Sequence, residues 1–317
     1  MTICFVVHEN NRGTILDRIA HEIGKGFEDA IYCYDQNNVP KVDHYFITHY
    51  SMLPNVLKQV NPGITPVTCF FTHDKGGLVN YVEAFNLCHA VVAESPEGEE
   101  LLISLGVNPN LVHFVAEGGD NERFKPHQRK DDGAVLISSR NYEDGRKNPE
   151  LIKKVIDLLP HRKFYFLGDG WDKSLEPREN IIHHHKIPYE NYYGIYGACS
   201  VFLSCAKLEG GGPNSLIESM HANLIPVVSD TGNARQYIQH GYNGFIFPVD
   251  STPEYVASLI ERAYKFRPQD QLPFNDVWRT VTQYTWPNFA KQMKEIITAN
   301  YAETLSSGEY KFKPEVV

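Results

Sequence analysis

The stretch Glu209-Gly-Gly-Gly-Pro-Asn-Ser-Leu-Ile-Glu218 carries the strongest signal in the sequence, and an apolar run ending at Ser229 follows it. Two carboxylates flank a glycine loop whose backbone can approach a ligand closely. Pro213 suits a first helical turn, and the backbone amides after it point out of a helix start, where anions bind. The stretch therefore predicts a loop, helix and strand that bind a phosphorylated sugar. The residues assigned to this ligand are Gly211, Gly212, Asn214, Ser215, Leu216 and Glu218. The alternative interpretation is a glycine-rich turn with two surface acids.

Short apolar runs alternate with amphipathic ones on both sides of this stretch, which predicts parallel sheets with helices on both faces. The expected strands are 3–7, 44–48, 67–72, 90–93, 111–115, 134–138, 164–167, 201–204 and 225–229. The expected helices are 14–23, 52–59, 78–86, 96–105, 149–159, 189–198, 215–221, 253–263 and 287–301. The fold class is α/β, with two doubly wound Rossmann-like domains facing a central cleft.

A polar, charged segment from Phe124 to Gly133 is the best linker candidate. It predicts a first domain over residues 1–127 and a second over 128–286. The last helix, 287–301, is compatible with packing back on the first domain.

Composition and charge limit the partners and the location expected for this protein. The chain has 317 residues, a net charge of −9 and six cysteines without paired spacing. The negative charge argues against nucleic acid and permits at most weak peripheral contact with an anionic membrane. No apolar run is long enough to span a bilayer, and no signal peptide is recognisable, so a cytoplasmic location is expected.

Several separate motifs resemble the retaining glycosyltransferases of the GT-B fold, family 4. The matching segments are Val91–Leu102, Glu117–Pro126 (similar to G-x-D-x-x-x-F-x-P), Leu136–Arg140, Phe166–Gly170 (with G-D-G), the Glu209–Glu218 pair and Gly232–Gln236. The pair is one residue further apart than in the family, Arg140 and Lys147 are unusually distant, and Gln236 stands where a glutamate is common.

The resemblance implies a donor that is a UDP- or GDP-linked sugar and assigns roles to individual residues. Arg140 and Lys147 would neutralise the leaving diphosphate, with Arg146 as an alternative to Lys147. Glu209 would face the transferred sugar and Glu218 the ribose hydroxyls. In the first domain, the backbone of Gly13 would approach the diphosphate, and His73 would lie beside the donor sugar.

No metal is expected, because two cations and a helix start can stabilise the leaving group without one and the chain has no Asp-x-Asp motif. The run His183-His184-His185 could suggest a metal site, but neighbouring strand residues point to opposite faces. A surface or loop run is the preferred interpretation. The following loop at Lys186 is a candidate for contacting the nucleotide base.

The leading function is transfer of a sugar to an acceptor hydroxyl with retention of anomeric configuration. The acceptor class, whether a glycan, a lipid-linked sugar or a small molecule, cannot be read from the residues. Two alternatives stay open: a non-hydrolysing nucleotide-sugar epimerase of the same fold, and an inactive scaffold of that fold.

Overall fold

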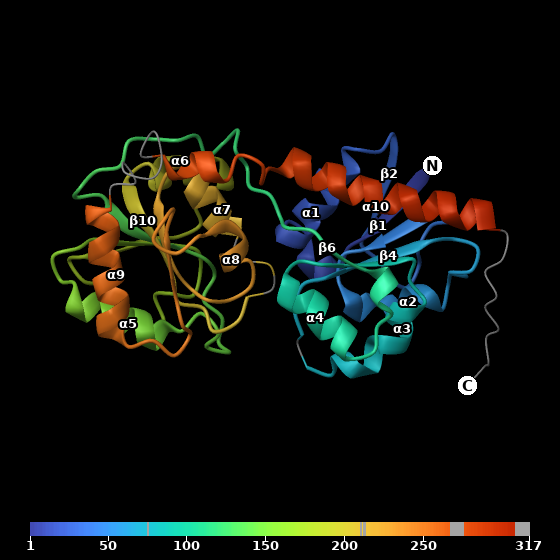
Figure 1. Cartoon of the computed structure of the whole chain (residues 1–317), viewed down its shortest axis with the longest axis horizontal. Coiled ribbons are helices and arrows are strands. Elements are labelled where there is room, and N and C mark those ends of the chain that lie inside the picture. The colour runs from blue at the N-terminus through green and yellow to red at the C-terminus, as the bar shows by residue number, and fades with distance from the viewer. Residues whose placement is uncertain (75, 210, 212–213, 267–275, 308–317) are drawn as a thin grey trace. The chain divides into compact units, whose positions relative to one another are not determined.

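The computed structural model describes residues 1–74, 76–209, 211, 214–266 and 276–307. It separates into two compact units, Met1–Ala116 with Trp286–Val317, and Glu117–Thr285. Each unit is built on a six-stranded sheet in which every strand pairing is parallel. Helices cover both faces of each sheet (Figure 1), as expected for doubly wound α/β units.

In the first unit the strand order is β2-β1-β3-β4-β5-β6. The strands are β1 (Thr2–Val6), β2 (Asp29–Cys33), β3 (His44–Ile47), β4 (Val67–Phe71), β5 (Ala90–Ala93) and β6 (Val112–Phe114). The α-helices are α1 (Ile15–Gly24), α2 (Leu53–Leu57), α3 (Val82–Asn86), α4 (Pro96–Ser104) and the C-terminal α10 (Trp286–Ser307).

In the second unit the order is β12-β11-β10-β7-β8-β9. The strands are β7 (Ala134–Ser138), β8 (Phe164–Leu167), β9 (Ile181–His184), β10 (Cys199–Ser204), β11 (Ile225–Ser229) and β12 (Phe245–Phe247). The α-helices are α5 (Pro149–Leu158), α6 (Tyr192–Tyr196), α7 (Asn214–His221), α8 (Ala234–Tyr237) and α9 (Pro253–Lys265).

The apolar strands of the first sheet bury both of their faces, because successive side chains alternate. Cys4, Val6, Tyr45 and Ile47 contribute to one core and Ile3, Phe5 and Phe46 to the other. The second core is closed by α10, whose Phe289, Met293 and Ile297 are fully or almost fully buried. Helix α10 packs beside α1, as Figure 1 shows.

The division between the units differs from the predicted boundary at residue 127. The units separate after Ala116, and the segment that follows packs on the second unit. Phe124 is fully buried there, with its ring 4.6 Å from that of Tyr196, and the hydroxyl of Tyr237 donates to the carbonyl of Glu117 at 3.0 Å. The charged segment from Phe124 to Gly133 has the sequence of a linker because its few buried residues are widely spaced, although it packs on the second unit.

Three strands were not predicted, β2, β9 and β12, and each lies at the edge of its sheet. β2 is half-buried with an exposed Asp29 and Ile31, and β9 ends in two histidines. An edge strand has one neighbour and partial burial, so its sequence needs no continuous apolar run. The histidine run is therefore partly strand, with His183 and His184 in β9 and His185 beyond it.

We expect the stability of the fold to fall in acid because of His44, at the start of β3. Its side chain is fully buried, with Nε2 2.9 Å from Thr68 Oγ1. Burial, and secondarily His89, lowers its pKa from 6.5 to about 3. The folded protein keeps this ring neutral while the unfolded chain protonates it, so stability is lost as the pH falls below about 6.5.

We expect His44 alone to lower the free energy of unfolding by about 2 kcal/mol between pH 6.5 and 5. Urea unfolding of His44→Gln against the parent across this range measures the difference. Substituting the exposed His185 in the same way provides the control. An unchanged pH slope in His44→Gln would contradict the assignment.

Candidate functional site

The candidate site lies at the point of the second sheet where the strand order reverses. β7 is the first strand of this unit, the chain proceeds to β8 and β9 on one side, and β10 then pairs with the other side of β7. In open parallel sheets, ligands bind outside the carboxyl ends of the strands at such a reversal. A small cavity opens here, lined by Ser139, Lys147 and Cys205 among others.

Lys147 and Glu209 meet at this reversal. Lys147 precedes α5 and Glu209 follows β10, and the Lys147 ammonium donates to Glu209 Oε1. The two side chains are 9% and 12% exposed, so the ion pair is largely shielded from water. The loops that carry them are joined by a backbone hydrogen bond of 2.7 Å from Lys207 N to Arg146 O. Two residues predicted to serve the diphosphate and the sugar are thus each other's partners in this structure.

The other two cations of the region are oriented differently. Arg146 lies over the ring of Tyr142 at 3.8 Å and near Asp144 at 3.6 Å. Arg140 is exposed and forms no ion pair with the residues that the structure describes. Lys147 is therefore the cation directed at Glu209, and Arg140 presents its guanidinium to solvent.

The Gly168-Asp169-Gly170 turn is built against the loop that follows β7. Gly168 and Gly170 have φ of +128° and +88°, and a Cβ on either would lie 2.4 or 2.6 Å from the carbonyl oxygens of Ser139 and Asn141. The fully buried Trp171 donates its indole N–H to Ser139 O at 2.7 Å. The G-D-G motif therefore packs against the backbone on both sides of Arg140.

Helix α7 places Glu218 in a nearly closed environment. Glu218 is 3% exposed, and the Tyr189 hydroxyl donates to its Oε1. Burial, and then the negative charge of Glu218, raises the pKa of both Tyr192 and Tyr196. Three tyrosines therefore surround a carboxylate that the sequence assigned to ribose hydroxyls.

The start of α7 is tied to the segment that precedes the second sheet. The amide group of Asn214 donates to Glu117 Oε2 at 2.6 Å. Ser215 Oγ is buried without a hydrogen-bond partner among the described residues, and the Leu216 side chain is buried. The first turn of α7 thus offers the buried Ser215 hydroxyl, while the Asn214 amide nitrogen is bonded to Glu117.

The glycine loop contacts the loop that follows β11. Gly211 O accepts from the backbone N–H of Asn233, and a Cβ on Gly232 would lie 2.5 Å from that same oxygen. Gly232 has a φ of +53°. Gly212 lies outside the described residues, so its predicted role is not addressed by the structure.

The predicted base-contacting loop follows β9. Lys186 is exposed and has a left-handed backbone, with φ of +51°. The rings of His183 and His185 stack with centroids 5.6 Å apart. Burial is the main cause that lowers the pKa of His183 and of His184. No cluster of three or more His, Cys, Asp or Glu side chains suited to a metal occurs among the described residues.

The two predicted residues of the first unit follow carboxyl ends of its strands. Gly13 lies after β1 with φ of +73°, and its N–H donates to Asp17 Oδ2 at 2.7 Å. The Tyr34 hydroxyl donates to the other Asp17 oxygen at 2.8 Å. The Gly13 amide is therefore occupied, and the side where a Cβ would stand is open. His73 follows β4 and is partly buried.

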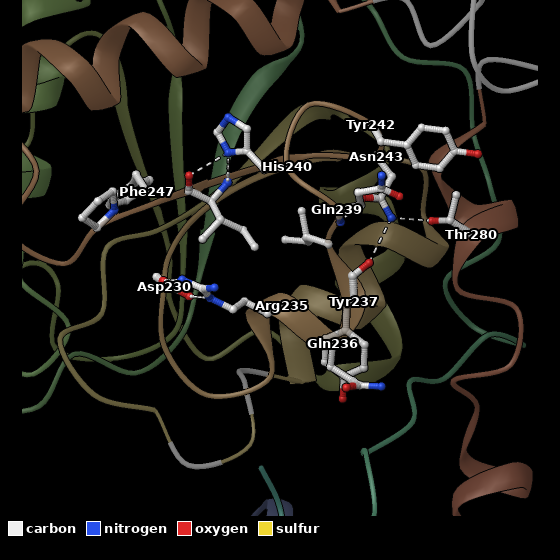
Figure 2. Close-up of a pocket in the computed structure, with 13 residues that line it drawn as sticks. Asp230, Arg235, Gln236, Tyr237, Gln239, His240, Tyr242, Asn243, Phe247 and Thr280 are labelled. Carbon is white, nitrogen blue, oxygen red and sulfur yellow. Dashed lines mark hydrogen bonds and ion pairs between the residues drawn. The ribbon is translucent and has the colours of Figure 1, made fainter. Parts of the chain in front are cut away.

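A separate cavity of about 680 Å³ lies beside α8 and β12. Figure 2 shows the Arg235 guanidinium facing Asp230 on one side and the Asn243 amide bound to Tyr237 and Thr280 on the other. Gln236 lines it, whereas none of Arg140, Lys147, Glu209 and Glu218 is among its described lining residues. It is distinct from the site at the strand reversal.

Sequence reasoning missed the residues that support the site. They are Tyr189, Glu117 and Asn233, which hold Glu218, Asn214 and Gly211. Tyr189 lies 29 positions from its partner and Glu117 lies 97 positions from Asn214. Residues this far apart in the sequence leave no short motif that would predict their contact. The family-like segments 117–126 and 232–236 contain Glu117 and Asn233, but they gave neither residue a supporting role.

The sequence matches one family model over part of its length, and the structure matches solved structures of one fold. Residues 119–271 match the family model described as glycosyl transferases group 1. Sulfoquinovosyl transferase SQD2 of Arabidopsis thaliana is 25% identical over 186 residues, which are 53% of this chain and 36% of that protein. The chain therefore spans about a third of the length of this curated relative. Within the described residues, no helix has the length and apolar character needed to cross a bilayer.

Two solved structures illustrate the likeness of the whole chain. HepE of Anabaena, in complex with UDP, is similar with a TM-score of 0.73 and 13% identity, over 94% of this chain and 100% of that one. Sucrose-phosphate synthase from Thermosynechococcus elongatus is similar with a TM-score of 0.74 and 12% identity, over 95% and 99%. These likenesses and the two parallel sheets confirm the predicted two-domain α/β fold of the GT-B type.

Proposed function

Residues 119–271 of this chain match the family model of the glycosyl transferases group 1, and from that match we propose that the chain transfers a sugar from a nucleoside-diphosphate sugar to an acceptor hydroxyl. The observation that carries the proposal is the Lys147–Glu209 pair at the strand reversal, one loop away from the start of α7. HepE of Anabaena is described in complexes with UDP and with UDP-glucose, which supports a UDP-linked donor.

The diphosphate is the leaving group of this reaction. As the bond to the anomeric carbon breaks, negative charge grows on the β-phosphate, and fixed positive groups stabilise it. Lys147 supplies a shielded ammonium, Arg140 a guanidinium suited to phosphate oxygens, and the start of α7 supplies backbone dipoles. Bound diphosphate competes with Glu209 for Lys147 and so releases the Glu209 carboxylate toward the sugar.

Glu209 and Glu218 then have separate tasks. Glu209 faces the transferred sugar, where its negative charge opposes the positive charge that develops at the anomeric carbon. Glu218 accepts hydrogen bonds from the ribose hydroxyls. We propose retention of configuration, with the leaving phosphate accepting the proton of the acceptor hydroxyl, so that no separate protein base is required.

A thermal-shift panel of nucleoside diphosphates and their sugars tests the proposal. A nucleotide that binds only the folded state raises the melting temperature by mass action. UDP, GDP or their sugars should stabilise the protein, and turnover of the donor should require an acceptor. Donor turnover without an acceptor would favour the epimerase alternative. Absence of stabilisation by every nucleotide would favour the scaffold alternative.

Activity should survive removal of divalent metal. The positive groups named above occupy the role that a cation has in metal-dependent enzymes, so EDTA is expected to change the transfer rate by less than about threefold. Transfer assays with and without EDTA measure this. Complete loss of activity that Mn²⁺ or Mg²⁺ restores would show that the phosphate site requires a metal.

A further inference from the structure

Tyr189 lies outside the predicted set of site residues and contacts Glu218 directly. It begins the short 3-10 turn Tyr189–Asn191 after β9, and its hydroxyl donates to Glu218 Oε1. Glu218 is 3% exposed. A carboxylate buried to this extent needs hydrogen-bond donors, because leaving it without them costs several kcal/mol.

The other two tyrosines around Glu218 are placed differently. The fully buried Tyr196 donates its hydroxyl to Ser138 Oγ at 3.0 Å. The ring of Tyr192 packs on that of Tyr189, with centroids 5.2 Å apart. Tyr189 is therefore the one of the three whose hydroxyl is directed at the carboxylate in the described structure.

The Tyr189 ring is itself held in place. The Arg123 guanidinium lies 4.7 Å from its centroid, and the Phe124 ring packs against it edge-on at 5.9 Å. Arg123 is in turn fixed by Asp120, through a hydrogen bond of 3.2 Å from Nε to Oδ2. The segment that resembles a family linker motif thus forms the support under this tyrosine.

We infer that Tyr189 is a positioning residue for Glu218, fixing the orientation in which the carboxylate receives the ribose of the nucleotide. A carboxylate has two oxygens and about four acceptor sites. The tyrosine uses one site on Oε1 and restrains rotation of the group, so the directions of the remaining sites are fixed. The inference rests on the proposed function, because it presumes that Glu218 binds ribose.

Tyr189→Phe removes the hydroxyl and keeps the ring with its Arg123 and Phe124 contacts. We expect UDP to bind about tenfold more weakly by calorimetry. The KM for the donor should rise with little change in kcat, since the ribose contact is similar in ground and transition states. Tyr193→Phe, at a neighbouring tyrosine whose side chain is exposed, is the matched control and should bind like the parent.

A double-mutant cycle separates positioning from general support. Glu218→Ala alone should weaken UDP binding by about 10- to 100-fold. Adding Tyr189→Phe to this variant should cause no further loss of affinity, because the tyrosine acts through the carboxylate. The preference for UDP over 2′-deoxy-UDP should also shrink in Tyr189→Phe. GDP and 2′-deoxy-GDP replace these probes if the thermal-shift panel selects guanine.

The outcomes distinguish the two proposals. If the parent binds neither nucleotide, the proposed function fails and the inference fails with it. If the parent binds a nucleotide and Glu218→Ala binds it as well as the parent, the ribose role of Glu218 and the inference fail while the proposed transfer stands. The inference alone is overturned if Glu218→Ala weakens UDP binding while Tyr189→Phe leaves binding unchanged or tightens it. It is also overturned if Tyr189→Phe weakens binding further in the Glu218→Ala background. Circular dichroism of each variant checks that it is folded.

Discussion

Replacing Lys147 with methionine should lower the turnover number by about 10²- to 10³-fold, the range measured when one group that stabilises developing negative charge is removed from an active site. Methionine preserves length and removes the ammonium. The shielded position of Lys147 makes its charge more effective than a surface charge, because little water screens it. Steady-state kinetics with a saturating donor would measure the loss.

This variant also leaves Glu209 without its cation in a setting where its side chain is 12% exposed. We expect a loss of about 1–3 kcal/mol in unfolding free energy, measurable by urea denaturation. Lys154→Met, an exposed lysine on α5, is the control for both measurements. Turnover close to that of the parent in a folded Lys147→Met protein would remove Lys147 from the phosphate site.

Replacing Glu209 with alanine should give a contrasting pattern. Turnover should fall by about 10²-fold, because the carboxylate facing the sugar is lost. Nucleotide affinity should be retained or improved, since Lys147 no longer has a carboxylate that competes with the diphosphate. Lys147→Met, in contrast, should weaken both turnover and nucleotide binding.

Calorimetry with UDP and GDP, together with steady-state kinetics, distinguishes the two variants. Glu176→Ala removes an exposed glutamate of the same unit and serves as the control. A Glu209→Ala protein that loses nucleotide affinity while keeping its turnover number would show that Glu209 supports the nucleotide and not the sugar.

Burial explains both the loss of stability expected from His44 at low pH and the strength of the charge expected at Lys147. In His44, burial disfavours the charged ring and stability is lost as the pH falls. In Lys147 and Glu209, opposite charges offset the cost of burial for each other. A phosphate ligand must therefore supply a comparable partner for Lys147 when it displaces Glu209.

The strands of the sheet interiors could be predicted from sequence because parallel strands covered on both faces must be continuously apolar. Ala90–Ala93, Ala134–Ser138 and Ile225–Ser229 agree with the observed bounds residue for residue. The glycine stretch likewise located α7, because a proline and a small polar residue mark a helix start.

Tertiary structure decided which of these groups touch one another. The edge strands β2, β9 and β12 form because a neighbour supplies their hydrogen bonds, and their own sequences lack the apolar continuity that marks a buried strand. The sequence by itself determined the α/β class, the alternation of elements and the charged residues near the glycine loop, since these follow from local periodicity. The pairing of Lys147 with Glu209 and of Tyr189 with Glu218 joins residues 62 and 29 positions apart. Only the packing of parallel strands, whose carboxyl ends meet at one edge of the sheet, brings such residues together.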